Sequence, residues 1–149
     1  MNDTKYIISF RQAVKADLSF LVMLRKQSMA GHLANAGIVM DDDQHKSRVL
    51  EFFSDSTIIS LNDKPIGLIK VGHLEKSLHI RQFQLLPSFQ SRGIGSKVLN
   101  AIKRKASNEK KPITLYVLLE NPAKNLYLKE GFEIEHTDKF QHKMRFIGE

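Results

Sequence analysis

The sequence has 149 residues, of which 42% are hydrophobic and 26% charged, as is typical of one globular domain. It contains no cysteine, which excludes disulfides, thiolate metal sites and a cysteine nucleophile, and it has no membrane-length apolar run or signal core. The net charge of +7 favours an anionic partner such as nucleic acid, an acidic membrane or a polyphosphate ligand. We therefore expect a cytoplasmic protein with a single domain over residues 1–149 and no membrane-spanning part.

The first half of the chain predicts a strand, two helices and a three-stranded meander. Alternating apolar residues predict the first strand over residues 6–11, and the helical spacing of apolar residues after Asp17 predicts the first helix. Asp41, Asp42 and Asp43 precede a second, short helix, which we expect them to cap; the alternatives are a metal site or attraction of a cationic amine. The meander follows as strands over residues 57–61, 66–74 and 78–86.

The last strand of the meander changes its alternation halfway along. Leu78 and Ile80 are separated by one residue, as are Phe83 and Leu85, but the two pairs have opposite parity. Because successive strand side chains point to opposite faces, a β-bulge near residues 81–82 would keep all four on one face. The alternative is a strand that is buried on both faces. The polar character of Arg81 and Gln82 favours the bulge.

A glycine-containing loop follows this strand and leads into a long helix over residues 97–108. Gly93 and Gly95 have no Cβ, so a ligand can approach their backbone, and the unpaired N–H groups of a helix start favour phosphate. The P-loop spacing is absent, and a dinucleotide fingerprint would need a glycine where Val98 stands. A tight turn between strand and helix is the alternative interpretation. The pattern that remains runs Gln90-Ser91-Arg92-Gly93-Ile94-Gly95.

The last third of the chain predicts a buried strand, a short helix and a closing hairpin. Residues 113–118 are mostly apolar and predict a strand that is buried on both faces. Pro122 suits the first turn of the next helix and Gly131 suits its end. The hairpin is predicted over residues 134–136 and 140–146.

Two segments resemble motifs of the GNAT superfamily, the acyl-coenzyme A dependent N-acetyltransferases. Residues 90–95 resemble motif A, whose pattern is Gln/Arg-x-x-Gly-x-Gly/Ala, and residues 121–132 resemble motif B. Asn121 departs from the family, because it lies two residues before Ala123 and many members place it three before. The residues of motif B that stand at the family spacing are Ala123, Tyr127, Gly131 and Phe132.

The resemblance implies both a fold and a cosubstrate. The implied fold is of the α/β (α+β) class, with a mixed, mostly antiparallel sheet, helices on both faces and two splayed parallel central strands. The implied cosubstrate is acetyl-coenzyme A, with its pyrophosphate on the glycine loop and its pantetheine arm between the splayed strands; we expect no metal ion. The cofactor-binding residues that it implies are Leu85, Leu86, Gln90, Ser91, Arg92, Gly93, Ile94, Gly95, Ser96 and Asn121.

Three side chains are candidates for the chemistry of acetyl transfer. Tyr127 resembles the family tyrosine that protonates the leaving thiolate; packing on its own helix is the alternative. His79 is the candidate base, because it lies eleven residues before Gln90, where several GNAT members place a Glu or His. A turn that pairs Leu74 with Leu78 would put His73 opposite His79. The two histidines could then form a proton relay or a metal pair, or they could be two polar residues on a solvent-exposed face of the sheet.

These features together predict an N-acetyltransferase that moves an acetyl group from acetyl-coenzyme A directly to a primary amine. The acceptor is expected to be a small molecule or a peptide amine, held by residues 29–43 and the final hairpin; a homodimer remains open. One alternative is a basic nucleic-acid-binding domain that uses residues 97–111, but no stacking aromatics are evident and we expect no nucleic-acid partner. Another is a GNAT fold that binds acyl-coenzyme A without catalysis.

Overall fold

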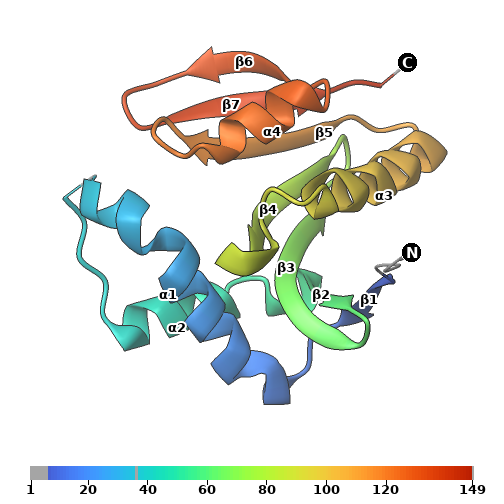
Figure 1. Ribbon diagram of the computed structural model, residues 1–149. Helices are drawn as coiled ribbons and strands as arrows, with labels where there is room; N and C mark the ends of the chain where they lie inside the picture. Colours follow the sequence, from blue (N-terminus) through green and yellow to red (C-terminus); the bar gives the residue numbers. More distant parts are fainter. Residues whose placement is uncertain (1–6, 36, 149) are drawn as a thin grey trace. The chain divides into compact units, whose positions relative to one another are not determined.

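The computed structural model describes residues 7–35 and 37–148, with the backbone alone for residues 30–35 (Figure 1). The strands pair in the order β1-β2-β3-β4-β5-β7-β6. β4 and β5 are parallel, whereas the pairs β1–β2, β2–β3, β5–β7 and β6–β7 are antiparallel, which confirms the expected fold class. The elements are β1 (Ile8–Gln12), α1 (Leu18–Asn35), α2 (Asp42–Leu50), β2 (Ser56–Leu61), β3 (Lys64–His73), β4 (Leu78–Leu85), α3 (Ile94–Glu109), β5 (Ile113–Leu118), α4 (Ala123–Lys129), β6 (Glu133–Thr137) and β7 (Gln141–Phe146).

The chain forms two compact units. The first unit comprises Met1–Lys70 and Gln82–Phe89, and the second comprises Val71–Arg81 and Gln90–Glu149. The chain therefore passes from one unit to the other within β3 and again within β4. No helix among the described residues is long and apolar enough to cross a membrane.

The first unit is built around the packing of α1 and α2 on β2 and β3. Its core contains Leu21 and Leu24 of α1, which are fully buried with Val49 of α2, Ile58 of β2 and Leu68 of β3. The start of α2 is a capping box, in which the Asp41 carboxylate accepts the Gln44 N–H at 2.8 Å while the Gln44 side chain accepts the Asp41 N–H at 2.8 Å. This confirms the expected capping role for Asp41.

Lys70 of β3 is a buried cation that the sequence did not single out. Its side chain is fully buried, and its ammonium donates to the carbonyls of Val49 at 3.1 Å and Glu51 at 2.6 Å, with a longer contact of 3.4 Å to Arg48. These carbonyls belong to the last turn of α2, where the helix leaves its C=O groups unpaired and its dipole is negative. Lys70 therefore closes the end of α2 and ties it to β3.

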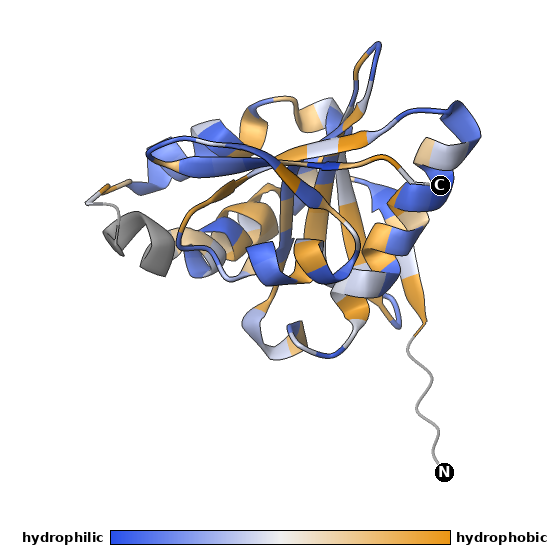
Figure 2. Cartoon of the chain, turned by 90° about the horizontal axis from the view of Figure 1, so that it is seen from above, coloured by the Kyte–Doolittle hydropathy of each residue, from blue (hydrophilic) through white to orange (hydrophobic). Residues whose placement is uncertain are grey.

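In the second unit, α3 and the turn that follows α4 contact Phe146 of β7 through Lys103 and Phe132. In α3 the residues Ile94, Val98 and Leu99 are buried. The helices carry both hydrophobic and hydrophilic residues along their length (Figure 2). α4 ends in a turn at Gly131, whose φ of 94° favours glycine. Phe132 then enters the core with a ring-centroid distance of 5.4 Å to Phe146 of β7.

The two ends of the β3–β4 hairpin show that β4 contains one extra residue. At the turn, the Leu74 N–H donates to the Ser77 carbonyl at 3.0 Å. Regular pairing from that turn would place Ile66 opposite Leu85, but the Leu86 N–H donates to the Ile66 carbonyl at 2.8 Å. An additional residue in β4 is what a bulge introduces, so these bonds support the bulge predicted for this strand.

The same turn shows that the predicted pairing of two histidines is wrong. Because Leu74 bonds to Ser77 and not to Leu78, His79 stands opposite Gly72, and His73 stands one position away. Gly72 leaves room for the Arg81 guanidinium, which lies where a Cβ would be, as expected on the face that carries His79. His73 therefore points to the other face and is exposed. A His73–His79 relay or metal pair does not form.

Candidate functional site

The loop before α3 has the backbone shape of an anion-binding site. Ser91 has a φ of 59° and Gly93 a φ of 80°, both in the left-handed region, and such alternation turns successive N–H groups toward one point. The first helical bond runs from the Lys97 N–H to the Gly93 carbonyl, so the N–H groups of Ile94, Gly95 and Ser96 precede the hydrogen-bonded ladder. A Cβ on Gly93 would meet nothing within 4 Å, so the space beside this residue is open.

Gly95 has a different explanation from the one expected. A Cβ at this position would lie 2.8 Å from the Leu126 Cδ2 atom of α4. The glycine therefore allows the first turn of α3 to pack closely against α4. Of the two glycines predicted to admit a ligand, Gly93 has the open space and Gly95 serves helix packing.

A polar network also joins the first turn of α3 to the end of α4. The Ser96 hydroxyl donates to a Glu130 carboxylate oxygen at 2.8 Å, and the Lys103 ammonium lies 3.2 Å from the other oxygen. Burial alone would raise the pKa of Glu130, but the hydrogen bonds from Ser96 and Lys103 lower it below its ordinary value. The carboxylate therefore stays charged, and it connects the candidate phosphate loop to the helix that carries Tyr127. Ser96 was predicted as a cofactor residue, whereas Glu130 and Lys103 were not singled out.

Tyr127 lies in α4 with its side chain almost completely buried. Its ring packs on Phe132 with a centroid distance of 5.6 Å, and its hydroxyl makes no hydrogen bond to any residue that the structure describes. Burial raises the pKa of this phenol well above its ordinary value, so the hydroxyl is protonated over the physiological pH range. A protonated hydroxyl without a partner can donate to a ligand.

Asn121 has a structural role at the start of α4. Its side-chain oxygen accepts the Ala123 N–H at 2.9 Å, which closes an Asx turn around Pro122, the N-cap residue of α4. The side-chain amide nitrogen retains two donors for other contacts. The free donors of that nitrogen keep the predicted cofactor role of Asn121 compatible with its structural role.

His79 lies on β4 beside β5, within the second unit. Its Nδ1 atom lies 2.7 Å from the Thr114 Oγ1 atom, and its ring meets the edge of Tyr116 at a centroid distance of 5.6 Å. Burial, with smaller effects from Arg81 and Lys143, lowers the pKa of His79 below its ordinary value. The imidazole is therefore neutral at pH 7 and able to accept a proton.

The remaining predicted residues of the cofactor site occupy the loop and the end of β4. Leu86, in the first unit, uses its N–H for Ile66 and its carbonyl for the Phe89 N–H at 2.9 Å. The exposed part of the loop comprises Gln90, Ser91, Arg92 and Gly93, and Ile94 and Leu85 are buried. The sheet thus already uses one of the backbone donors that were predicted to meet a pantetheine arm, the N–H of Leu86.

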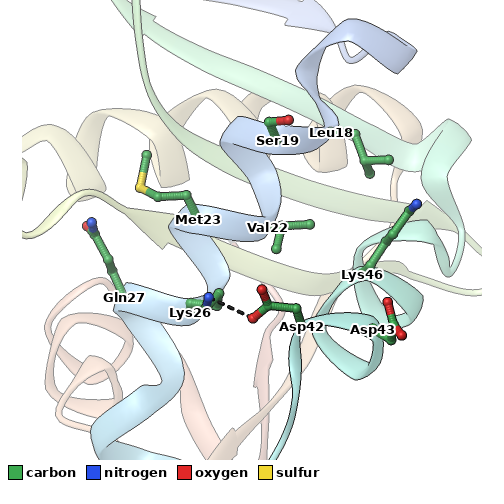
Figure 3. A pocket seen from close by; sticks show the side chains of 9 residues that line it. All are labelled: Leu18, Ser19, Val22, Met23, Lys26, Gln27, Asp42, Asp43 and Lys46. Carbon is green, nitrogen blue, oxygen red and sulfur yellow. Dashed lines mark ion pairs between the residues drawn. The ribbon is translucent and has the colours of Figure 1, made fainter.

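The first unit has an open hollow of about 560 Å³ between α1 and α2 (Figure 3). Lys26 and Asp42 form an ion pair of 2.7 Å at this hollow. Only Asp42 and Asp43 belong to the predicted acceptor segment 29–43, and the side chains of residues 30–36 lie outside the described residues. The lining residues are Leu18, Ser19, Val22, Met23, Lys26, Gln27, Asp42, Asp43 and Lys46. In the described residues no group of three or more side chains could hold a metal ion.

Comparison with protein families gives a match over more than half of the chain. A family model described as an acetyltransferase (GNAT) domain matches residues 53–134, a range that includes both segments that resemble the family motifs, 90–95 and 121–132. No curated protein matches the sequence significantly.

Solved structures of similar fold cover nearly the whole chain. The PaiA N-acetyltransferase of Thermoplasma acidophilum, in complex with coenzyme A, is 20% identical over 94% of this chain and 98% of that chain, with a TM-score of 0.77. PH1933 of Pyrococcus horikoshii OT3 is 21% identical over 96% and 99%, with a TM-score of 0.77. The aminoglycoside N-acetyltransferase AAC(6')-Iy, in complex with coenzyme A, is 21% identical over 94% and 97%, with a TM-score of 0.65. At these identities the likeness shows the shared fold.

Proposed function

Because the chain belongs to the GNAT acetyltransferase family, we propose that it transfers the acetyl group of acetyl-coenzyme A directly to a primary amine. The observation that carries this proposal is the loop before α3, where Ser91 and Gly93 have left-handed backbone conformations and the first N–H groups of the helix precede its hydrogen-bonded ladder. Two of the similar structures are complexes with coenzyme A, which supports the same cosubstrate for this chain. The polyphosphate of that molecule also suits the net charge of +7.

Acetyl-coenzyme A would supply the activated thioester, and the residues of the loop would hold its phosphates. The N–H groups of Ile94, Gly95 and Ser96 form the positive end of the α3 dipole and can donate to phosphate oxygens without losing bonds of their own. The space beside Gly93 is open, and the contacts of Gly95 and Ser96 with α4 hold the first turn in place.

His79 and Tyr127 would handle the two protons of the reaction. His79 is neutral at pH 7 and can accept the proton that the amine nitrogen loses as its bond to the acetyl carbon forms. Tyr127 is protonated and can donate to the sulfur as the carbon–sulfur bond breaks. No covalent enzyme intermediate is needed, which agrees with the absence of cysteine.

A thiol-release assay across a panel of primary amines tests this proposal. Wild-type protein should release free coenzyme A only when acetyl-coenzyme A and a suitable amine are both present. Acetyl-coenzyme A should also raise the melting temperature, since a ligand that binds only the native state stabilises it. A shift in melting temperature without turnover on any amine would instead favour a non-catalytic acyl-coenzyme A binding protein. Absence of both effects would refute the proposal.

A further inference from the structure

Thr114 is the polar residue of β5 that lies directly beside His79. The two residues are register partners in the parallel pair of β4 and β5, and Thr114 is buried with 8% of its surface exposed. Its Oγ1 atom lies 2.7 Å from the His79 Nδ1 atom, a distance typical of a strong hydrogen bond. Neither motif of the family includes Thr114, and the sequence alone gave no reason to connect it with His79.

The surroundings of Thr114 favour one direction for this hydrogen bond. A threonine hydroxyl donates one hydrogen and can accept two. The Thr114 Oγ1 atom also lies 3.5 Å from the Ser77 Oγ atom, which can take the Thr114 hydrogen. Thr114 is then an acceptor toward His79, so the proton of the neutral imidazole lies on Nδ1 and the lone pair lies on Nε2.

The other ring nitrogen of His79 is Nε2. The His79 Nε2 atom makes no hydrogen bond to any residue in the described part of the chain. The charged groups that act on the ring are Arg81 of β4 and Lys143 of β7, and Tyr116 of β5 packs edge-on. Both charges are cationic and disfavour the imidazolium, the Lys143 ammonium is itself paired with Glu135 of β6 at 3.2 Å, and the hydrogen-bond partner of Nδ1 is Thr114.

We propose that Thr114 is a positioning residue that holds His79 as the Nδ1–H tautomer and presents the Nε2 lone pair to the acceptor amine. This inference rests on the proposed function, because it assigns how the candidate base is oriented. When Nε2 takes a proton from the amine, the Nδ1–H bond to Thr114 persists, so the ring need not rotate during the transfer.

Three variants separate this role from a purely structural one. Thr114→Val keeps the branched shape and removes the hydroxyl, whereas Thr114→Ser restores the hydroxyl on a smaller side chain. Thr137→Val is a matched control, because the Thr137 Oγ1 atom lies 2.8 Å from the His142 Nδ1 atom on the β6–β7 hairpin. The control therefore removes a second threonine–histidine hydrogen bond in the same unit.

The readouts are the tautomer of each histidine, from imidazole ¹⁵N chemical shifts, and the pH dependence of turnover. Wild-type and Thr114→Ser proteins should show His79 protonated on Nδ1, and Thr114→Val should show increased Nε2–H. Turnover of Thr114→Val should fall about tenfold, which corresponds to one hydrogen bond of about 1.4 kcal/mol. The acid limb of the pH–turnover profile of Thr114→Val should move to lower pH, because the imidazolium of His79 loses a hydrogen-bond acceptor and its pKa falls. Thr137→Val should alter His142 alone.

Two results would overturn the inference. One is an Nε2–H tautomer of His79 in the wild-type protein, and the other is a Thr114→Val variant with unchanged turnover and pH profile. The tautomer measurement needs no substrate, so it also distinguishes the two proposals. An Nδ1–H tautomer that depends on Thr114, in a protein that acetylates no amine, would refute the proposed function while keeping the structural assignment of Thr114.

Discussion

Replacing Tyr127 by phenylalanine tests the proposed acid with little disturbance of the fold. The change keeps the ring and its packing on Phe132, at a ring-centroid distance of 5.6 Å, and it removes only the hydroxyl. That hydroxyl has no hydrogen-bond partner among the described residues, although the side chain is only 6% exposed. Because no hydrogen bond to a described residue is lost, and this oxygen is not among the fully buried unpaired polar atoms, its removal should leave stability nearly unchanged.

Tyr127→Phe should change turnover and leave the melting temperature nearly unchanged. A stability change below about 0.5 kcal/mol would move the melting temperature by less than about 2 °C in a chain of this size. Turnover should fall by about 10²–10⁴-fold, the usual contribution of a general acid, while the Michaelis constant for acetyl-coenzyme A stays nearly constant. Because burial raises the pKa of Tyr127, wild-type turnover should also show no basic limb from this group near pH 10.

Differential scanning fluorimetry and the thiol-release assay measure these effects on the same preparation. A fully active Tyr127→Phe variant would show that the thiolate leaves without this acid. A variant destabilised by more than about 1 kcal/mol would show that the hydroxyl has a structural partner, and the packing interpretation would then hold. Loss of acetyl-coenzyme A affinity in step with turnover would place the hydroxyl in ground-state binding instead.

Three further predictions follow from the site and the core. Gly93→Ala should weaken acetyl-coenzyme A binding at least about tenfold by calorimetry, because alanine disfavours the φ of 80° that shapes the loop. Gly131→Ala, with a φ of 94° and a Phe146 carbon 3.2 Å from the added Cβ, is the control, and it should lose stability and keep affinity. Lys70→Met should lower the urea unfolding free energy by about 3 kcal/mol, because carbonyls at the end of α2 lose a buried charged donor; a loss below about 0.5 kcal/mol would contradict this. Burial and then Arg25 lower the pKa of His45, so stability should be complete above about pH 6.5 and decline as pH falls through the lowered value, and His45→Gln should flatten that decline in urea titrations at several pH values.

Local patterns in the sequence determined the element order, the cap at Asp41 and the loop at Gly93. These features depend on residues within a few positions of one another: the Asp41–Gln44 capping box spans three positions, and the left-handed φ of Gly93 is a property of one residue. The spacing of Ala123, Tyr127 and Gly131 likewise follows from one short helix. Such interactions can be recognised in a sequence because chain connectivity already brings the residues together.

The tertiary structure alone decided the contacts that join distant parts of the chain. Thr114 meets His79 across 35 positions, and Glu130 meets Ser96 across 34, because strand pairing and helix packing bring them together. The reason for Gly95 became visible only when Leu126 was placed against it. The histidine pairing failed because one residue of register at the turn reverses the face on which a strand side chain lies. Polar contacts of this kind leave no periodic signal in the sequence, since each depends on a register or a crossing that many other residues set.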